Sequence, residues 1–223
     1  LRHFRLGAVL MHIPDGFLAP QIYLPAYAVA AGAWAWAARG LRERLDETTV
    51  PRLAMLTALA YGLGLVMVPV PGGTSGHMLG VALLALIFGV RLAFLAYSLV
   101  LLLQALLFGA GGVTTLPINA LAMGLIGATA AVATKSLLAR FNETAAVAIA
   151  AWLSVVLSAI VVALVLGSQP LIAHQPDGTP LFFPFGIEIT LPAVLLPHLV
   201  IGIGEAALTV PIWRYARSRK WCS

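Results

Sequence analysis

The sequence predicts an all-α membrane protein with seven transmembrane helices. Of its 223 residues, 61% are hydrophobic and only 9% are charged, whereas soluble domains carry about 25% charged residues. Apolar stretches close to the ~20 residues that cross a bilayer recur along the chain. So few charges could not cover the surface of a soluble fold, and the same composition excludes a disordered chain.

Seven apolar segments are expected to form the helices. They lie at 21–38, 53–70, 78–90, 92–109, 117–134, 145–167 and 191–213. The third segment is short for a full crossing, so it is expected to be tilted or partly re-entrant. Many segments are rich in Gly and Ala, which allows helices to approach closely inside a bilayer.

The basic residues predict the orientation of these helices. With seven spans, eleven of the thirteen Lys and Arg residues fall in loops on one side: Arg39, Arg42, Arg44, Arg52, Arg91, Lys135, Arg140, Arg214, Arg217, Arg219 and Lys220. The opposite loops, 71–77, 110–116 and 168–190, contain none. Because basic loops stay in the cytoplasm, the N-terminus is expected outside and the C-terminus inside.

Residues 1–10 are expected to be a non-native or misassigned extension. The chain begins with Leu1, and Arg2 and Arg5 are the two basic residues that violate the charge pattern. Translation is therefore expected to begin at Met11. The single cysteine, Cys222, cannot form an internal disulfide.

The charge and the motif content exclude two classes of function. The net charge of +5 is accounted for by basic cytoplasmic loops, so no nucleic-acid partner is expected beside the lipid bilayer. The sequence has no Gly-x-x-x-x-Gly-Lys-Ser/Thr loop, so ATP-driven transport would need an ATPase on another subunit. No bound cofactor is expected.

The head of the chain, Met11 to Gly16, carries the first candidate metal site. A His directly after a free amino terminus can offer three nitrogens to one divalent cation: the α-amine, the His12 backbone nitrogen and the His12 imidazole. Pro14, Asp15 and Gly16 form a turn signal that would fold this head back onto the protein. The alternative interpretation is a flexible outer tail that contains a turn.

A second candidate lies in the loop between Pro69 and Met78. Its two prolines and three glycines cannot continue a helix, and His77 follows them. The alternative is a Gly-rich hairpin in which His77 is only hydrogen-bonded. Together, Met11, His12 and His77 would complete a four-nitrogen set, which suits Ni(II) or Cu(II), with Co(II) also an option, better than tetrahedral Zn(II).

Four other polar residues stand out. Asp15 and Asn119 are expected to hold a metal-ligating His side chain in place without binding the metal themselves. The alternative for Asn119 is an interhelical hydrogen bond. Glu205 lies within the last apolar segment, with His198 seven residues earlier on roughly the same helix face. An intramembrane carboxylate is costly, so Glu205 is either functional or paired with a polar neighbour.

One alternative belongs to a different class of function. Residues 73–76 read Gly-Thr-Ser-Gly, which is similar to the nucleophile motif of rhomboid-type intramembrane serine proteases. Ser75 would be the nucleophile and His198 the base. Short Gly/Ser motifs are common in hairpins, and nothing else in the sequence indicates acyl transfer.

Four motifs resemble the CbiM/NikM family. They are MHIPDGFLAP at 11–20, GGTSGHMLG at 72–80, QALLFGAGG at 104–112 and HLVIGIGEAALT at 198–209. That family comprises the substrate-binding membrane components of cobalt and nickel energy-coupling factor transporters. One departure is Ala110, where the family often has Asp.

The resemblance implies a non-enzymatic subunit of an ATP-driven cobalt importer in the bacterial inner membrane, with nickel as the alternative substrate. Residues 11–223 would form a single transmembrane metal-binding domain, with Met11, His12 and His77 as ligands of Co(II) or Ni(II). The implied partners are a transmembrane coupling protein, two ATPase subunits and a small auxiliary membrane protein.

Overall fold

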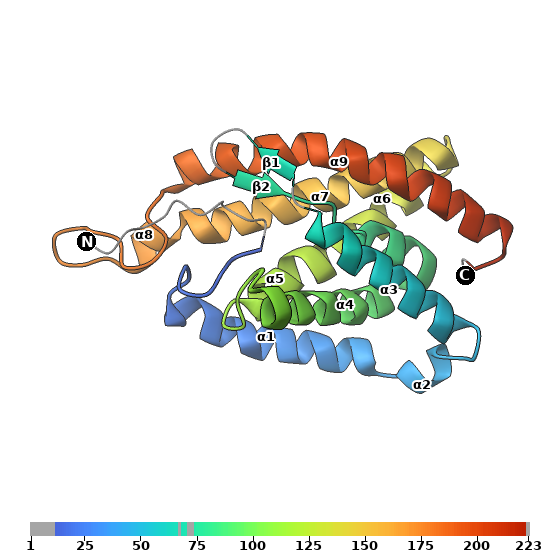
Figure 1. Cartoon of the computed structure of the whole chain (residues 1–223), viewed down its shortest axis with the longest axis horizontal. Helices are drawn as coiled ribbons and strands as arrows, with labels where there is room; N and C mark the ends of the chain where they lie inside the picture. The colour runs from blue at the N-terminus through green and yellow to red at the C-terminus, as the bar shows by residue number, and fades with distance from the viewer. Residues whose placement is uncertain (1–11, 67, 71–73, 222–223) are drawn as a thin grey trace.

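A computed structural model describes residues 12–66, 68–70 and 74–221. This part of the chain is almost entirely helical (Figure 1). In chain order the elements are α1 (Pro20–Ala38), α2 (Leu41–Arg44), α3 (Thr49–Leu65), β1 (Val68–Val70), β2 (Thr74–Gly76), α4 (Val81–Phe108), α5 (Leu116–Asn119), the π-helix η1 (Ala120–Gly127), α6 (Ala128–Leu138), α7 (Glu143–Gly167), α8 (Gln169–Ile172) and α9 (Ile187–Ser218).

Four helical stretches in the described residues are long and apolar enough to cross a membrane: Val81–Phe108, Leu116–Leu138, Glu143–Ile172 and Ile187–Ser218. The helix α4 joins two of the predicted segments, and Gly89 interrupts it with φ 80° and ψ 168°. With α4 counted as two helices on either side of Gly89, the described chain contains one helix for each of the seven predicted segments.

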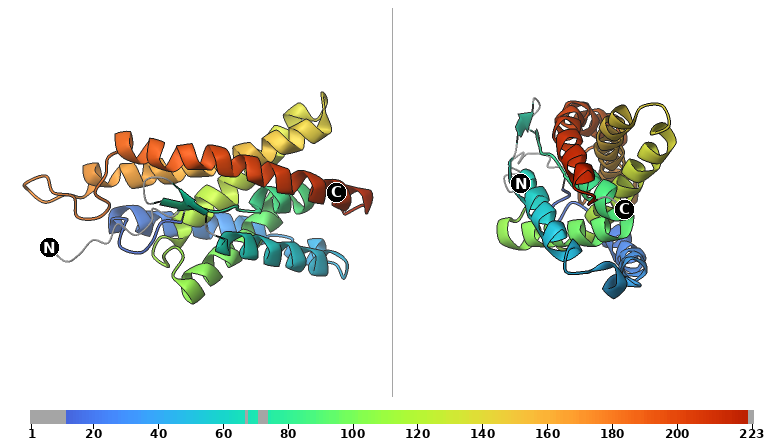
Figure 2. Two further views of the ribbon diagram at one scale, coloured as in Figure 1. Left: turned by 45° about the horizontal axis from the view of Figure 1, so that its top comes forward. Right: turned by 90° about the vertical axis from the view of Figure 1, so that its right-hand side faces the viewer.

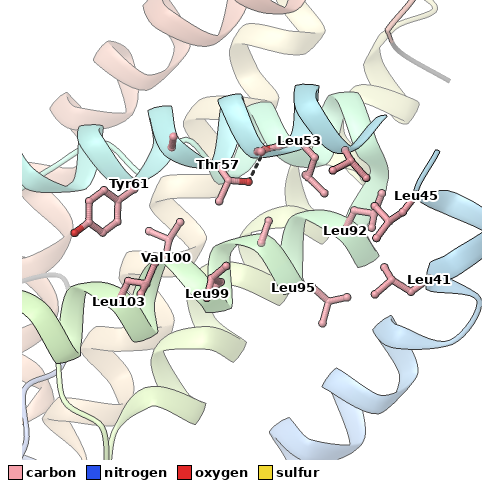
Figure 3. Close-up of a pocket in the computed structure, with 14 residues that line it drawn as sticks. Leu41, Leu45, Leu53, Thr57, Tyr61, Leu92, Leu95, Leu99, Val100 and Leu103 are labelled. Atoms are coloured by element: carbon pink, nitrogen blue, oxygen red, sulfur yellow. Dashed lines mark hydrogen bonds between the residues drawn. The ribbon is translucent and has the colours of Figure 1, made fainter. Parts of the chain in front are cut away.

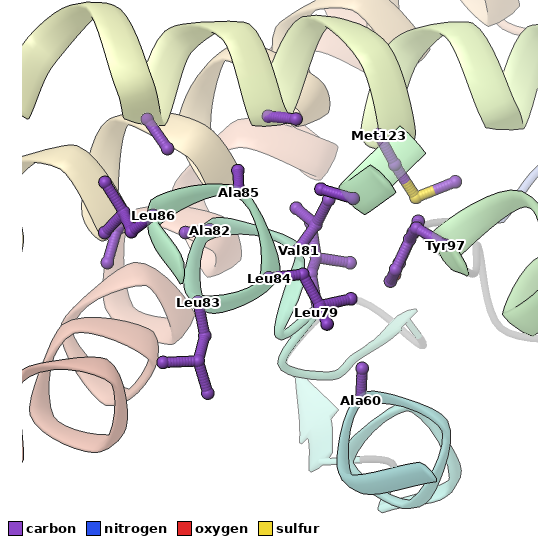
Figure 4. Packing of buried hydrophobic residues seen from close by; sticks show 14 of the residues in the cluster. Ala60, Leu79, Val81, Ala82, Leu83, Leu84, Ala85, Leu86, Tyr97 and Met123 are labelled. Atoms are coloured by element: carbon purple, nitrogen blue, oxygen red, sulfur yellow. The ribbon is translucent and has the colours of Figure 1, made fainter. Parts of the chain in front are cut away.

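The first part of α4 lies inside the protein. Every residue from Val81 to Ile87 is buried, and Tyr97 and Met123 pack beside this stretch (Figure 4). Eight helical residues extend only about 12 Å, too little to cross a bilayer. The short third segment is therefore a helix surrounded by protein, where the irregular backbone that precedes it is tolerated.

Two predicted boundaries are wrong. The segment 53–70 does not stay helical to its end, because α3 stops at Leu65 and Val68–Val70 pairs antiparallel with Thr74–Gly76. Pro69 cannot donate to a helical hydrogen bond, and its β-branched valine neighbours favour an extended backbone. The fold is thus not purely helical. The next helix begins at Val81 instead of residue 78, after Gly80 in the left-handed region at φ 72°.

The helices α7 and α9 lie side by side along most of their length (Figure 2). Their contact is close: a Cβ added at Gly202 would come within 2.7 Å of the Trp152 ring. The Trp152 indole N–H also donates to the Leu199 carbonyl at 2.9 Å. The candidate site described below lies against this pair of helices.

The π-helix η1 is held by serines of α7. Ser154 donates to the Gly127 carbonyl at 2.9 Å, and Ser158 donates to the Ala122 carbonyl at 3.1 Å. A π-helical turn is wider than an α-helical one and is often found at functional sites. Here η1 directly follows Asn119, the residue that fixes the head of the chain.

Candidate metal site

An open groove of about 560 Å³ lies between α3 and the later part of α4 (Figure 3). Aliphatic side chains line most of it, and the Thr57 hydroxyl is occupied by a hydrogen bond to the Leu53 carbonyl. The groove contains no imidazole and no carboxylate. Its described lining therefore offers no ligand of the kind that holds a transition metal.

The structure brings two predicted ligands together. The imidazole rings of His12 and His77 lie 4.6 Å apart between centroids and are inclined by 56°. Both side chains are only 1% exposed. The Nε2 atom of each ring is buried and has no hydrogen-bond partner among the described residues. Two imidazoles with unsatisfied ring nitrogens therefore lie side by side, although 65 positions separate them in the sequence.

The ring of His77 is oriented by its own backbone. Its Nδ1–H donates to the Met78 carbonyl at 2.9 Å, which leaves the lone pair on Nε2. The following residues, Leu79 and Gly80, donate their N–H groups to the Glu205 carboxylate at 2.8 and 2.7 Å. Glu205 is thus paired with the backbone, and it holds the segment that carries His77.

The segment that carries His12 is fixed one residue further along. The Asn119 amide oxygen accepts from the Ile13 N–H at 3.0 Å, and its amide nitrogen donates to the Ile13 carbonyl at 3.1 Å. Gly112 donates to the same carbonyl at 3.0 Å. Asn119 therefore holds the peptide that follows the imidazole, and does not hydrogen-bond to either ring in the described structure.

Asp15 joins the head to the loop before α5. Its carboxylate accepts hydrogen bonds from the N–H groups of Val113 and Thr114 and from the Thr114 hydroxyl. It makes no hydrogen bond to His12 or His77 in the described residues. Asp15, like Asn119, supports the site by fixing the backbone of the head.

Small residues allow the head to approach its neighbours. Gly111 has φ +85°, and a Cβ added there would lie 3.1 Å from the His12 Cβ. Next to it, a Cβ at Gly112 would fall within 2.4 Å of the Asp15 backbone nitrogen. These contacts explain why the motif at 104–112 ends in two glycines. A side chain at either position would displace the head of the chain from its place against this loop. Ala110, the departure from the resemblance, is buried beside them.

Burial favours the neutral form of both imidazoles. It lowers the pKa of His12 well below the ordinary value of 6.5, and positive charge on His77 or His198 would lower it further. Burial also lowers the pKa of His77, although the Met78 carbonyl opposes this change. Metal ions bind the neutral form of imidazole, so this environment favours a metal over a proton.

A third imidazole lies close by. His198 of α9 is 3% exposed, and its Nε2 is also buried without a partner among the described residues. A Cβ added at Gly76, the residue before His77, would lie 3.6 Å from that nitrogen. The signal in the sequence was its position one heptad before Glu205, which left its role open.

Some predicted features cannot be placed. Met11 lies outside the described residues, as do residues 1–10. The Ser75 side chain is likewise not described, so the structure does not show whether it approaches His198. Within the described ranges no group of three or more His, Cys, Asp or Glu side chains is arranged to hold a metal. A metal at the imidazole pair would need ligands in addition to these side chains.

The fold and the imidazole pair define a class: a helical, multi-pass membrane protein with a pair of buried imidazoles whose Nε2 atoms have no partner among the described residues. The family model described as "Cobalt uptake substrate-specific transmembrane region" (CbiM) matches residues 12–222. The chain therefore belongs to this family of cobalt and nickel transport proteins.

Some relatives are named for nickel transport and others for cobalt transport. The probable fused nickel transport protein LarMN of Lactiplantibacillus plantarum is 36% identical over 93% of this chain and 64% of its own length. The cobalt transport protein CbiM of Anoxybacillus flavithermus is 32% identical over 92% of this chain and 81% of its own. The chain also spans only 59% of the fused nickel transport protein NikMN of Rhodobacter capsulatus.

A solved structure supports the fold. The structure described as "Crystal Structure of an Truncated Transition metal Transporter" superimposes with a TM-score of 0.88 at 34% identity, and covers 93% of this chain and 99% of its own. These proteins are named for metal transport, and the comparisons indicate no catalytic activity. They give no support to the alternative of a serine protease at Ser75.

The Asp15 clamp should make stability depend on pH. Burial raises the pKa of Asp15, but the hydrogen bonds from Thr114 and Val113 outweigh it and bring the pKa below the ordinary 3.8. A group with a lowered pKa stabilises the fold above its unfolded pKa, and this contribution is lost as the pH falls through the folded value. Asp15→Asn should therefore lower the melting temperature near neutral pH, by a margin that shrinks below about pH 4.

Thermal unfolding of the purified protein in detergent across this pH range measures the effect. Glu47→Gln removes one exposed carboxylate from the loop before α3 and serves as the control. A melting-temperature difference for Asp15→Asn that stays constant from neutral pH to about pH 3 would contradict the role of the ionised clamp.

Proposed function

We propose that this chain is the metal-capturing subunit of an importer for divalent late transition metals. The observation that carries the proposal is the pair of buried Nε2 atoms of His12 and His77, which belong to rings 4.6 Å apart between centroids and lack partners among the described residues. Unsatisfied buried acceptors are costly. A cation between the rings would satisfy both.

The proposed further ligands are an α-amine at Met11 and the His12 backbone nitrogen, which would add two donors to the two imidazoles. The clamps at Ile13 and Asp15 support this proposal, because they fix the backbone directly after His12. Four nitrogens with no carboxylate form a set that selects Ni(II), Cu(II) or Co(II) over Mg(II) and Ca(II).

The choice of metal moves from cobalt toward nickel. The sequence alone placed Co(II) first. A four-nitrogen set binds Ni(II) more tightly than Co(II) in the general affinity order of divalent metals. The 36% identical relative is named for nickel and the 32% identical one for cobalt. We therefore propose Ni(II) as the preferred substrate, with Co(II) as the second.

Transport is proposed to use ATP supplied by other subunits. The sequence holds no phosphate-binding loop of the Walker type. The proposed partners are a transmembrane coupling protein, two ATPase subunits and a small auxiliary membrane protein. The chain captures the metal from outside and changes conformation to release it inward.

The orientation follows from charge. Basic residues cluster at one end of the helices, where Arg91 stacks on Trp36 and Arg217 lies over Trp213. The imidazole pair is carried by the head before α1 and the segment before α4. We propose that the basic end faces the cytoplasm of a bacterial inner membrane, so the site opens outward.

Removing one imidazole should abolish capture and leave the fold intact. His77→Ala is expected to weaken Ni(II) binding by at least about 100-fold. A residue that binds the metal directly should contribute at least as much affinity as a residue that only orients a ligand, and loss of the latter lowers metal affinity by about 10–100-fold. Equilibrium dialysis with the purified protein measures this. His174→Ala is the matched control, since His174 is exposed and bonds only to the neighbouring Gln175 carbonyl. Loss of binding in the control with retention in His77→Ala would overturn the site.

Direct competition decides the metal. Unlabelled Co(II) should displace radioactive Ni(II) from the purified chain only at a several-fold excess, because nitrogen sites follow the order Co(II) below Ni(II). Zn(II) is the useful third competitor, since it prefers tetrahedral ligands and should compete less well than its affinity order suggests. Displacement by equimolar or lower Co(II) would reverse the proposed preference.

The outward position of the 168–190 loop can be tested on whole cells. A membrane-impermeant maleimide should label Gln175→Cys in intact cells, in a Cys222→Ser background that removes the native thiol. Glu47→Cys, at the basic end, should react only after the membrane is opened. The reverse labelling pattern would invert the proposed orientation and place the metal site on the cytoplasmic side.

A further inference from the structure

The buried face of α9 carries a line of polar side chains. Residues on this face recur every three or four positions, as expected for one side of a helix. Four of the buried residues are polar: Thr190, His198, Glu205 and Thr209. Ionisable groups inside a membrane are costly and often mark ion pathways. The line passes the imidazole pair and continues toward the basic end of the bundle.

His198 is the member of this line nearest to the capture pair. Its Nδ1–H donates to the Val194 carbonyl at 2.6 Å, so the lone pair is on Nε2. That Nε2 is buried, lies against Gly76 and has no partner among the described residues. No described hydrogen bond uses this nitrogen, so its lone pair is available to bind a cation that leaves His77.

Two further oxygen groups follow on the same face. Glu205 lies two turns after His198, about 10 Å along the helix axis, and is the one buried carboxylate in the described part of the chain. Thr209 lies one turn beyond, and its hydroxyl is buried without a partner in the same part. A divalent cation crossing a low-dielectric interior needs such groups to replace its hydration.

We propose that the metal leaves the capture pair along this face of α9, with His198 Nε2 as its first inward ligand and the Glu205 carboxylate as the next. The inference rests on the proposed capture function and on its orientation. It is based on the positions of three buried polar groups of α9 beyond the capture pair: the His198 Nε2, the Glu205 carboxylate and the Thr209 hydroxyl.

The same contacts suggest how inward movement would release the capture site. Glu205 holds the N–H groups of Leu79 and Gly80. A cation that binds this carboxylate competes with those two hydrogen bonds. As they lengthen, the segment that carries His77 is freed, so the outer ligand is withdrawn when the inner one is occupied. Capture and release would then be mutually exclusive states of one carboxylate.

The test separates binding from transport. His198→Ala and His198→Gln are introduced in the full chain, and radioactive Ni(II) is used both for equilibrium binding to purified protein and for uptake by cells that express the complete transporter. Binding should stay within about threefold of the wild type, while uptake should fall about tenfold or more, the size of effect that loss of a metal contact produces. Retained binding also shows that each variant folds.

Thr190→Val is the matched control. Thr190 lies two turns before His198 on the same buried face, and its hydroxyl is occupied by the Phe185 carbonyl. It should change neither binding nor uptake. Thr209→Val, beyond Glu205, should reduce uptake and leave binding unchanged.

Three results would overturn the path. Wild-type uptake in both His198 variants shows that no step uses this nitrogen. Loss of binding together with uptake in His198→Gln places His198 in the capture set instead. Failure of the wild-type chain to bind Ni(II) or Co(II) overturns the capture function itself, and the path with it, whereas the first two results leave the capture function standing.

Discussion

The buried carboxylate of Glu205 is the contact on which the site depends. It accepts two backbone hydrogen bonds from Leu79 and Gly80, at the place where the chain enters the short first part of α4. Backbone N–H groups at a helix start have no partner within the helix, and inside a membrane they find no water. Without a carboxylate at this position, the short helix could not begin in the middle of the bundle, and His77 would have no fixed place.

A second set of contacts fixes the other half of the site. The head of the chain is neither helix nor strand, so its backbone groups need partners from elsewhere. Asn119 supplies both a donor and an acceptor to Ile13, and Asp15 accepts from the loop at 113–114. The glycines at 111 and 112 let these segments touch. Two imidazoles far apart in sequence therefore come together through two independent clamps, one on the segment that carries His12 and one on the segment that carries His77.

Much of the fold could be predicted from hydropathy, because a bilayer requires long apolar helices and little else satisfies that pattern. The helices α1, α7 and α9 lie close to segments 21–38, 145–167 and 191–213. The errors occur where tertiary contacts override the apolar pattern. Val68–Val70 is as apolar as a helix end, yet Pro69 and the valines place it in a hairpin. Similarly, residue 78 could begin a helix by composition, but Glu205 takes the backbone donors that define the start.

The site could be predicted only in part. His12 and His77 were identifiable from their motifs, since the chelating head and the Gly-rich loop are local features. Asn119 and Asp15 were expected to support a histidine side chain, but the structure shows them holding the backbone beside it. That distinction depends on distances between segments a hundred residues apart, which no local pattern contains. The same limit applies to Glu205, whose partners lie 125 and 126 positions away.

The chemistry of the site follows from what surrounds it. A permanent carboxylate ligand would hold a divalent cation tightly in a low-dielectric interior, which suits storage better than transport. Here the rings are neutral, and the nearest buried carboxylate is engaged with backbone N–H groups. In the proposed function, the site would select a metal by nitrogen coordination while the buried carboxylate stays occupied by the backbone. In the proposed path, a small movement of the segment before α4 would change which of these groups the cation meets, which is what capture followed by release requires.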